Sequence, residues 1–342
     1  MEWLADYAMF LAKAATVLLA LVVLLMLMVS LKDRHRRPDG TLTVNKVNEQ
    51  IGRMTERLAQ SVLDKKAFKL RQKGRKLEAK ARNKGSRDTA ERPRVFVLCF
   101  DGDIKATAVD HLRQEVTAVL EMARPEDEIV LKLESGGGMV HSYGLAASQL
   151  VRIRDAGIPL TVCVDKVAAS GGYMMACIGD KVLSAPFAML GSIGVVAQLP
   201  NFHRVLKKHD VDYEMLTAGE YKRTLTMFGE NTERGREKFR EDLENIHRLF
   251  KDFVARYRPQ LNVDEVATGE VWFGIEAQQR ALADDVKTSD EYITGRVREA
   301  DVFEVHYVTR KRMQDKLAGG FTGIVDRLLL IWASRFHNQK FW

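Results

Sequence analysis

One serine stands among small residues in the sequence AASGGY, which spans residues 168–173. Alanine and glycine leave the backbone around Ser170 bare, so a carbonyl group can approach the hydroxyl and the neighbouring N–H groups together. A nucleophilic serine needs this access, because its attack creates an oxyanion that positioned donors must stabilise. The pattern therefore predicts a serine nucleophile at a junction between a strand and a helix.

The base that would activate this serine is harder to identify. None of the histidines after Ser170 has a signature around it: His203, His209, His247, His306 and His337. A lysine can act as the base when burial in an apolar site lowers its pKa from the usual value of about 10.4. Lys222 has apolar neighbours that would allow such burial: Tyr221, Leu225, Met227 and Phe228. Most lysines are solvated surface charges, and spacing alone does not separate the two interpretations.

Three motifs together carry a family resemblance. The AASGGY sequence is followed by GSIGV at residues 191–195 and by GEYK at residues 219–222, and Lys222 lies 52 positions after Ser170. In order and spacing these motifs resemble the signal peptide peptidase A family of membrane-bound serine proteases. The resemblance covers residues 95–307 and is greatest to short inner-membrane members with one catalytic module.

This resemblance implies a role for each motif residue. Ser170 would be the nucleophile of a Ser-Lys dyad, Lys222 its general base, and Ser192 the hydroxyl that holds the lysine amine. The alternative for Ser192 is a turn residue in a glycine-rich corner. The resemblance also implies ring-like homo-oligomers in which neighbouring subunits complete the substrate groove. No cofactor and no metal ion is predicted.

The oxyanion of such a reaction requires two backbone donors. Gly171 follows the nucleophile and is the first candidate. The second should lie in the sequence ESGGG at residues 134–138, which follows an apolar run and precedes a helical stretch. The family usually has proline where this chain has Gly136, so the loop is less constrained here. Matching the motif residue by residue selects Gly138 as the second donor.

The amino terminus predicts a membrane anchor within residues 1–31. Residues 14–31 form an uncharged run of 18 residues, about 27 Å as a helix and close to the thickness of the hydrocarbon core. A basic block at residues 32–37 follows, which is typical of an uncleaved span rather than a signal peptide. The resemblance places the protein in a bacterial inner membrane. The positive-inside rule predicts a cytoplasmic catalytic domain, whereas the resemblance implies a periplasmic one.

Residues 32–94 are basic and polar and are interpreted as a linker. Apolar residues at steps of three and four predict one helix with an apolar stripe: Val44, Val47, Ile51, Met54, Leu58 and Val62. Residues 65–87 are dense in lysine and arginine and contribute to the net charge of +7. Attraction to anionic lipid headgroups is one interpretation of this block, and a solvated linker is the other. Nucleic-acid binding is not favoured, because Phe68 is its one aromatic residue.

The remaining chain predicts an α/β fold. The expected strands are 95–100, 129–133, 160–164, 181–185 and 211–216, with helices at 107–123, 139–156 and 235–258. Resemblance implies the spiral of β-α-β units shared with the Clp protease and the crotonases. The peptidase domain would span residues 95–310, and an amphipathic helix residues 311–342. Three cysteines without paired spacing argue against a disulfide framework or a zinc site.

The functional prediction is a membrane-anchored serine endopeptidase that hydrolyses apolar peptides such as signal-peptide or membrane-protein fragments. Two other classes compete with it. A catalytically silent membrane scaffold of the same fold would not need the serine, the lysine and the glycine loop. A crotonase-like acyl-CoA enzyme would share the oxyanion hole but would not need Ser170 and Lys222 together.

Overall fold

The computed structural model describes residues 9, 13, 16, 40–85 and 92–309. The predicted anchor lies almost entirely outside these residues, and the predicted helix at 311–342 lies wholly outside them. Within the described part, no helix combines the length and the apolar character that crossing a membrane requires. The chain divides into two compact units, residues 42–307 and residues 1–41 with 308–342.

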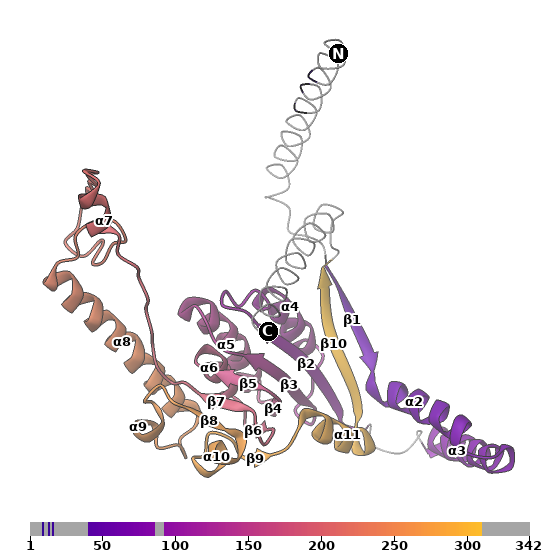
Figure 1. The fold of residues 1–342 in the computed structure, drawn as a ribbon. Helices are drawn as coiled ribbons and strands as arrows, with labels where there is room; N and C mark the ends of the chain where they lie inside the picture. Colours follow the sequence, from indigo (N-terminus) through magenta and orange to yellow (C-terminus); the bar gives the residue numbers. More distant parts are fainter. Residues whose placement is uncertain (1–8, 10–12, 14–15, 17–39, 86–91, 310–342) are drawn as a thin grey trace, which may run out of the picture. The chain divides into compact units, whose positions relative to one another are not determined.

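The described residues contain one sheet of ten strands, and its main path runs in the order β1-β10-β2-β3-β4-β6-β9 (Figure 1). The strands are β1 (Gly40–Lys46), β2 (Arg94–Gly102), β3 (Glu128–Ser135), β4 (Leu160–Val164), β5 (Val167–Ala169), β6 (Lys181–Ser184), β7 (Met189–Gly191), β8 (Val271–Phe273), β9 (Asp285–Val286) and β10 (Asp301–Thr309). The short strand β5 leaves the main path and pairs in parallel with β3 and β7, while β7 pairs antiparallel with β8. The candidate nucleophile, Ser170, directly follows β5 on this second path.

Helices connect and cover these strands. They are α2 (Val47–Val62), α3 (Lys65–Gly85), α4 (Val109–Leu120), α5 (Val140–Asp155), α6 (Gly171–Ala176), α7 (His203–Lys208), α8 (Glu233–Tyr257), α9 (Val263–Val266), α10 (Gly274–Gln279) and α11 (Ser289–Glu299). The central strands β2, β3 and β4 are parallel and almost wholly buried. The near-continuous apolar sequences of these strands predict that both faces of the sheet are covered by other elements. A large core packs α4, α5 and α6 on one face, and a smaller one packs α11 on the other.

Four of the five predicted strands are confirmed as β2, β3, β4 and β6, and the three predicted helices as α4, α5 and α8. The strand predicted at residues 211–216 is wrong, because this segment between α7 and α8 has no strand pairing. Its apolar side chains are exposed, with Leu216 at 94% and Val211 at 49%. An apolar run forms a strand only where a partner strand is available, and the sheet does not reach this segment.

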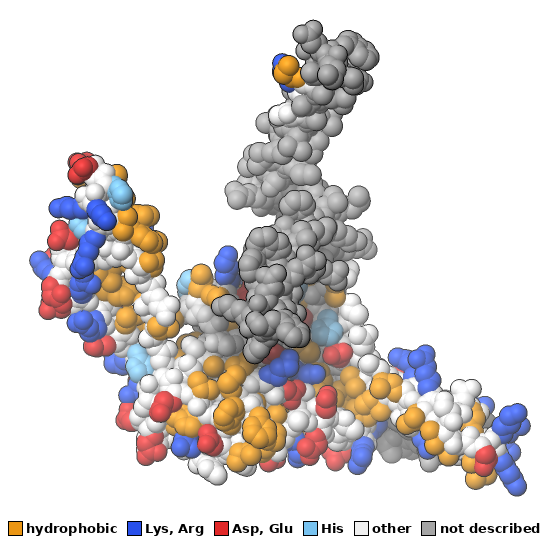
Figure 2. Space-filling model, viewed as in Figure 1, with side chains coloured by type: hydrophobic (Ala, Val, Ile, Leu, Met, Phe, Trp, Pro, Cys, Tyr) orange, Lys and Arg blue, Asp and Glu red, His pale blue; other side chains and the backbone are white. Residues whose placement is uncertain are grey.

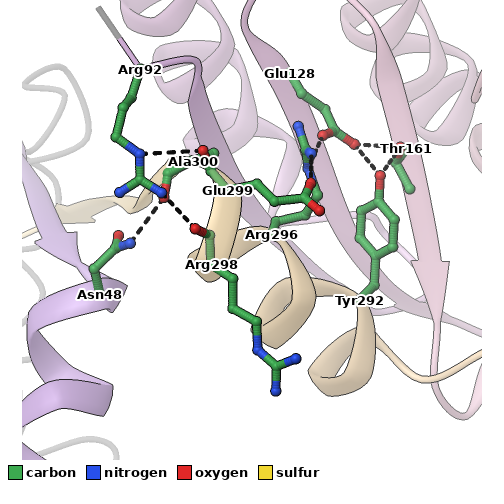
Figure 3. Close-up of polar contacts among 9 residues, drawn as sticks. All are labelled: Asn48, Arg92, Glu128, Thr161, Tyr292, Arg296, Arg298, Glu299 and Ala300. Carbon is green, nitrogen blue, oxygen red and sulfur yellow. Dashed lines mark hydrogen bonds and ion pairs between the residues drawn. The ribbon is translucent and has the colours of Figure 1, made fainter.

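Residues 40–62, which lie within the predicted linker, form a strand and a helix. β1 forms the edge of the sheet beside β10, so Val44 belongs to this strand and the helix begins only at Val47. Asn48 fixes this start: its amide donates to the carbonyls of Val297 and Ala300 at 3.0 and 2.9 Å, and its Oδ1 accepts from the N–H of Val302 at 2.8 Å. Figure 3 shows Asn48 reaching the end of α11.

A buried carboxylate attaches the middle of α11 to the sheet (Figure 3). Glu128, at the start of β3, accepts hydrogen bonds from Tyr292 at 2.5 Å, from Thr161 at 2.7 Å and from Arg296 at 2.8 Å. Burying a carboxylate is costly unless it is hydrogen-bonded and paired with a cation, and both conditions are met. These contacts hold α11 against the sheet, on the face opposite α4 and α5.

Candidate active site

Ser170 lies in the sharp turn between β5 and α6. Its backbone has φ 52° and ψ −119°, a conformation that residues with a Cβ rarely adopt and that costs on the order of 1–3 kcal/mol. The N–H of Ser170 donates to the carbonyl of Gly191 at 2.8 Å, which holds the turn in place. The strained turn places the serine at the wall of a cavity, as the sequence predicted for a strand-to-helix junction.

The two predicted oxyanion donors, Gly138 and Gly171, line the same cavity as Ser170. Within the described part of the chain, neither N–H donates a hydrogen bond, so both are available to a ligand. Packing excludes larger residues at both positions. A Cβ on Gly138 would lie 2.1 Å from the carbonyl oxygen of Ile104, and one on Gly171 would lie 2.4 Å from the ring of Tyr143. The structure therefore brings serine and both glycines together.

A hydroxyl pair that the sequence analysis missed supports the glycine loop. The Ser135 hydroxyl accepts from the N–H of Gly137 at 3.0 Å and lies 2.5 Å from the hydroxyl of Tyr143. The Tyr143 hydroxyl donates in turn to the carbonyl of Asp103 at 2.8 Å. Tyr143 is fully buried, and its burial raises the pKa of its phenol. The loop thus has a rigid support even though glycine replaces the proline expected at position 136.

The cavity beside Ser170 is small and mostly apolar. Its volume is about 80 Å³, and its apolar lining comes from α5, α6, α8 and the segment after β7: Val140, Met174, Val195, Val196, Ile246 and Phe250. An apolar cavity next to a nucleophile and two free N–H groups favours a small apolar side chain on the residue whose carbonyl is attacked. The apolar stripe on α8 therefore contributes to this cavity through Ile246 and Phe250.

Ser192 lies in a second strained turn, directly after β7, with φ 50°. Its N–H donates to the carbonyl of Glu270 at 2.6 Å. A hydrogen bond joins this turn to the turn at Ser170, because the carbonyl of Gly191 accepts from the N–H of Ser170. The next residue, Ile193, has its carbonyl 3.2 Å from Nε2 of His247 on α8. Ser192 is therefore close to the candidate nucleophile in the fold.

Lys222 is not among the residues that line the cavity of its own chain. It is exposed, in the segment between α7 and α8. Its neighbour Tyr221 contacts the start of α8, where Arg234 donates to the Tyr221 hydroxyl at 3.2 Å and Lys238 lies over the ring. The cavity contacts α8 at residues 246 and 250, roughly 12–24 Å further along a helix that rises 1.5 Å per residue. A lysine side chain does not span this distance.

A buried arginine, paired with an aspartate that solvent reaches, supports the helix that follows Ser170. Arg258, at the end of α8, is 1% exposed and donates to Asp284 at 2.8 and 3.0 Å and to the carbonyl of Ala281 at 2.7 Å. Asp284 also accepts from the N–H of Val182 in β6 at 2.6 Å. Tyr173 of α6 donates to the carbonyl of Leu282 in the same loop at 3.0 Å. This cluster connects α6, α8 and the sheet beneath the cavity.

We expect Arg258→Ala to lower the free energy of unfolding by about 2–5 kcal/mol, because it empties a buried site and removes the hydrogen bonds to Asp284 and to the carbonyl of Ala281. The matched control is Lys251→Ala, which removes the ion pair with Asp264, whose side chain is 84% exposed. That change should cost less than about 1 kcal/mol. Denaturant titration of the solubilised protein measures both. Equal losses in the two variants would contradict a structural role for the Arg258 cluster.

Comparisons with known proteins add to this geometry. Residues 2–150 match the sequence profile described as "Peptidase family S49 N-terminal", and residues 152–302 match the one described as "Peptidase family S49". A "Probable protease SohB" of Haemophilus influenzae is 45% identical over 322 residues, 92% of this chain and 91% of that protein. Proteins of the same name from two Buchnera aphidicola subspecies are 43% identical over 86% of this chain and 40% identical over 99% of it.

Proposed function

Because this chain belongs to peptidase family S49 and is a serine peptidase, we propose that Ser170 is its nucleophile and Lys222 its general base, in a membrane-anchored endopeptidase. One observation carries the proposal. Ser170, Gly138 and Gly171 meet at one apolar cavity, with both glycine N–H groups available. That is the arrangement which peptide-bond hydrolysis through an acyl-enzyme requires.

The reaction proceeds in two steps. Ser170 Oγ attacks the carbonyl carbon of the scissile bond while the lysine amine accepts the hydroxyl proton. The oxyanion accepts hydrogen bonds from the N–H groups of Gly138 and Gly171, which the strained turn and the Ser135–Tyr143 pair hold in position. The lysine then returns its proton to the leaving amine. Water, deprotonated by the same lysine, hydrolyses the acyl-enzyme and frees Ser170.

The lysine in this proposal comes from a neighbouring copy of the chain. Contacts at the start of α8 hold Lys222 away from its own cavity. The segment that carries it also exposes many apolar side chains, among them Val196, Leu199, Phe202, Val205, Tyr213 and Leu216. A soluble surface rarely exposes so much apolar area, and a second copy of the chain would cover it. Ser192, beside the nucleophile turn, would then orient the incoming amine.

The substrate in this proposal is a peptide with small apolar side chains, such as a fragment of a signal peptide or membrane protein. The apolar lining of the cavity supports this class. Helices α2 and α3 support a place at the membrane surface. Met54, Leu58 and Val62 are 63%, 65% and 71% exposed, and α3 has seven lysines and arginines between residues 65 and 77. Figure 2 shows hydrophobic and basic side chains next to each other over these helices, a combination that anionic lipid surfaces attract.

Covalent labelling tests the proposal. A serine-directed fluorophosphonate should modify the wild-type chain at Ser170, as located by mass spectrometry of the digested protein, because only an activated hydroxyl reacts readily. Ser170→Ala should not be labelled, and Lys222→Ala should be labelled far more slowly. The exposed Ser148 provides the control, since Ser148→Ala should react like the wild type. A label found at another serine would refute the assignment.

A further inference from the structure

Three metal-ligating side chains lie on adjacent strands, on the opposite face of the sheet from α4 and α5. Val97 of β2 pairs in parallel register with Glu304 of β10. Side chains alternate between the two faces along a strand, so Cys99 shares the face of Val97, and Glu304 and His306 share the face of Val302. Val97 and Val302 both belong to the small core beneath α11.

The ligand atoms of these residues are close together. Cys99 Sγ lies 4.0 Å from Glu304 Oε1, which lies 3.4 Å from His306 Nε2, and all three atoms lie within 4.8 Å of one another. A tetrahedral zinc ion with Zn–S bonds of about 2.3 Å and Zn–N and Zn–O bonds of about 2.0–2.2 Å separates its ligand atoms by roughly 3.2–3.7 Å. Small side-chain rotations would therefore bring the three atoms to bonding distance of one ion.

The chemistry of the three ligands suits zinc. A thiolate, an imidazole and a carboxylate are the donor types that zinc accepts in proteins. Burial, with the nearby Glu304 charge as the second cause, raises the pKa of the Cys99 thiol to about 11. A metal ion binds the thiolate, so its binding to Cys99 would displace the thiol proton.

A solvent-accessible cavity gives a cation access to Cys99. It has a volume of about 160 Å³ and lies at the carboxyl ends of β2, β3 and β4. Three carboxylates line it, those of Asp101, Glu134 and Asp165, together with the amine of Lys132. Lys132 pairs in register with Cys99 and opposes a cation there, and Lys166 neutralises Glu134 through an ion pair of 2.9 Å. Asp101 and Asp165 still outnumber Lys132 and favour cations in the cavity.

We infer that Cys99, Glu304 and His306 bind a zinc ion that joins β10 to β2, with water as the fourth ligand. The ion would act where the hydrogen bonds of the two strands stop. Their register ends at the pair of Val97 with Glu304, and Cys99 and His306 both lie beyond it. The site is separate from the Ser170 cavity, since none of the three ligands lines that cavity.

Cobalt binding to the purified full chain tests this inference, because Co²⁺ occupies zinc sites and a thiolate ligand gives it a charge-transfer band in the near ultraviolet. We expect one Co²⁺ per chain with this band, displaced by Zn²⁺. Cys99→Ser should abolish the band, and His306→Gln should weaken binding by more than about tenfold. The matched control is Cys163→Ser, whose thiol lies on the same face but outside the cluster.

Proton release supplies a second readout. Zinc binding to the wild-type chain in weakly buffered solution should release about one proton per ion, and Cys99→Ser should release almost none. Circular dichroism of each variant checks that the fold is retained. A wild-type chain without the cobalt band, or a band that persists in Cys99→Ser, would overturn the inference. Neither readout depends on peptide hydrolysis, so the result is independent of the roles proposed for Ser170 and Lys222.

Discussion

Replacement of Ser170 by alanine is expected to lower peptide hydrolysis by roughly 10⁵- to 10⁶-fold, the loss typical of removing the nucleophile from a serine peptidase. The change deletes one oxygen atom and leaves the glycine N–H groups and the apolar cavity in place. The fold should also survive, because serine and alanine both carry a Cβ and meet the same backbone strain at φ 52°. Substrate affinity should therefore change far less than turnover.

Turnover of a fluorogenic peptide with small apolar side chains measures this effect. Ser148→Ala is the matched control, because it makes the same chemical change at an exposed position on α5. It should retain wild-type activity. If Ser170→Ala retained more than a trace of activity in a preparation free of wild-type protein, another side chain would have to be the nucleophile.

The second large effect concerns Lys222 and should appear as complementation. Ser170→Ala and Lys222→Ala should each be inactive, since nucleophile and base act as a unit. A mixture of the two, dissociated and allowed to reassemble, should recover activity. In a ring where each site takes its serine from one copy and its lysine from the next, random mixing of equal amounts restores roughly a quarter of the sites.

This experiment distinguishes the two possible origins of the lysine. If a chain used its own Lys222, no mixture of the variants would contain a complete site, and activity would stay absent. Reassembly of each variant alone is the control and should give nothing. Activity that appears only in the mixture would support a dyad formed between copies. It would also explain why the contacts of Tyr221 hold the lysine at the start of α8.

The parts of the fold that depend on local pattern could be predicted from the sequence. Continuous apolar runs identified β2, β3 and β4, and the three-four spacing of apolar residues identified α8. Glycines beside Ser170 predicted that bare backbone would meet the nucleophile, and the cavity at Ser170 agrees with this. The apolar run at residues 211–216 gave a wrong prediction, because an apolar pattern does not reveal whether a partner strand is in reach.

Contacts between distant parts of the chain could not be predicted in this way. The Ser135 hydroxyl gave no signal, because its role depends on Tyr143 from the following helix. Arg258 resembles any charged residue at a helix end until Asp284 is brought against it. Cys99 and Glu304 are separated by 205 positions, so the spacing rules that argued against a zinc site did not apply to them. Strand register brings Cys99 to Glu304, and helix packing forms the other two pairs; sequence patterns leave both open.

The hydrogen bonds of Asn48 have a consequence for how the protein is synthesised. They join residue 48 to the carbonyl of Ala300, which lies 252 positions later in the chain. A ribosome adds about 5–20 residues per second, so a nascent Asn48 waits roughly 10–50 s for this acceptor to be made. Strands β2, β3 and β4 are complete well before then. We therefore expect the central sheet to form during translation, with α2 docking after residue 302 has left the exit tunnel.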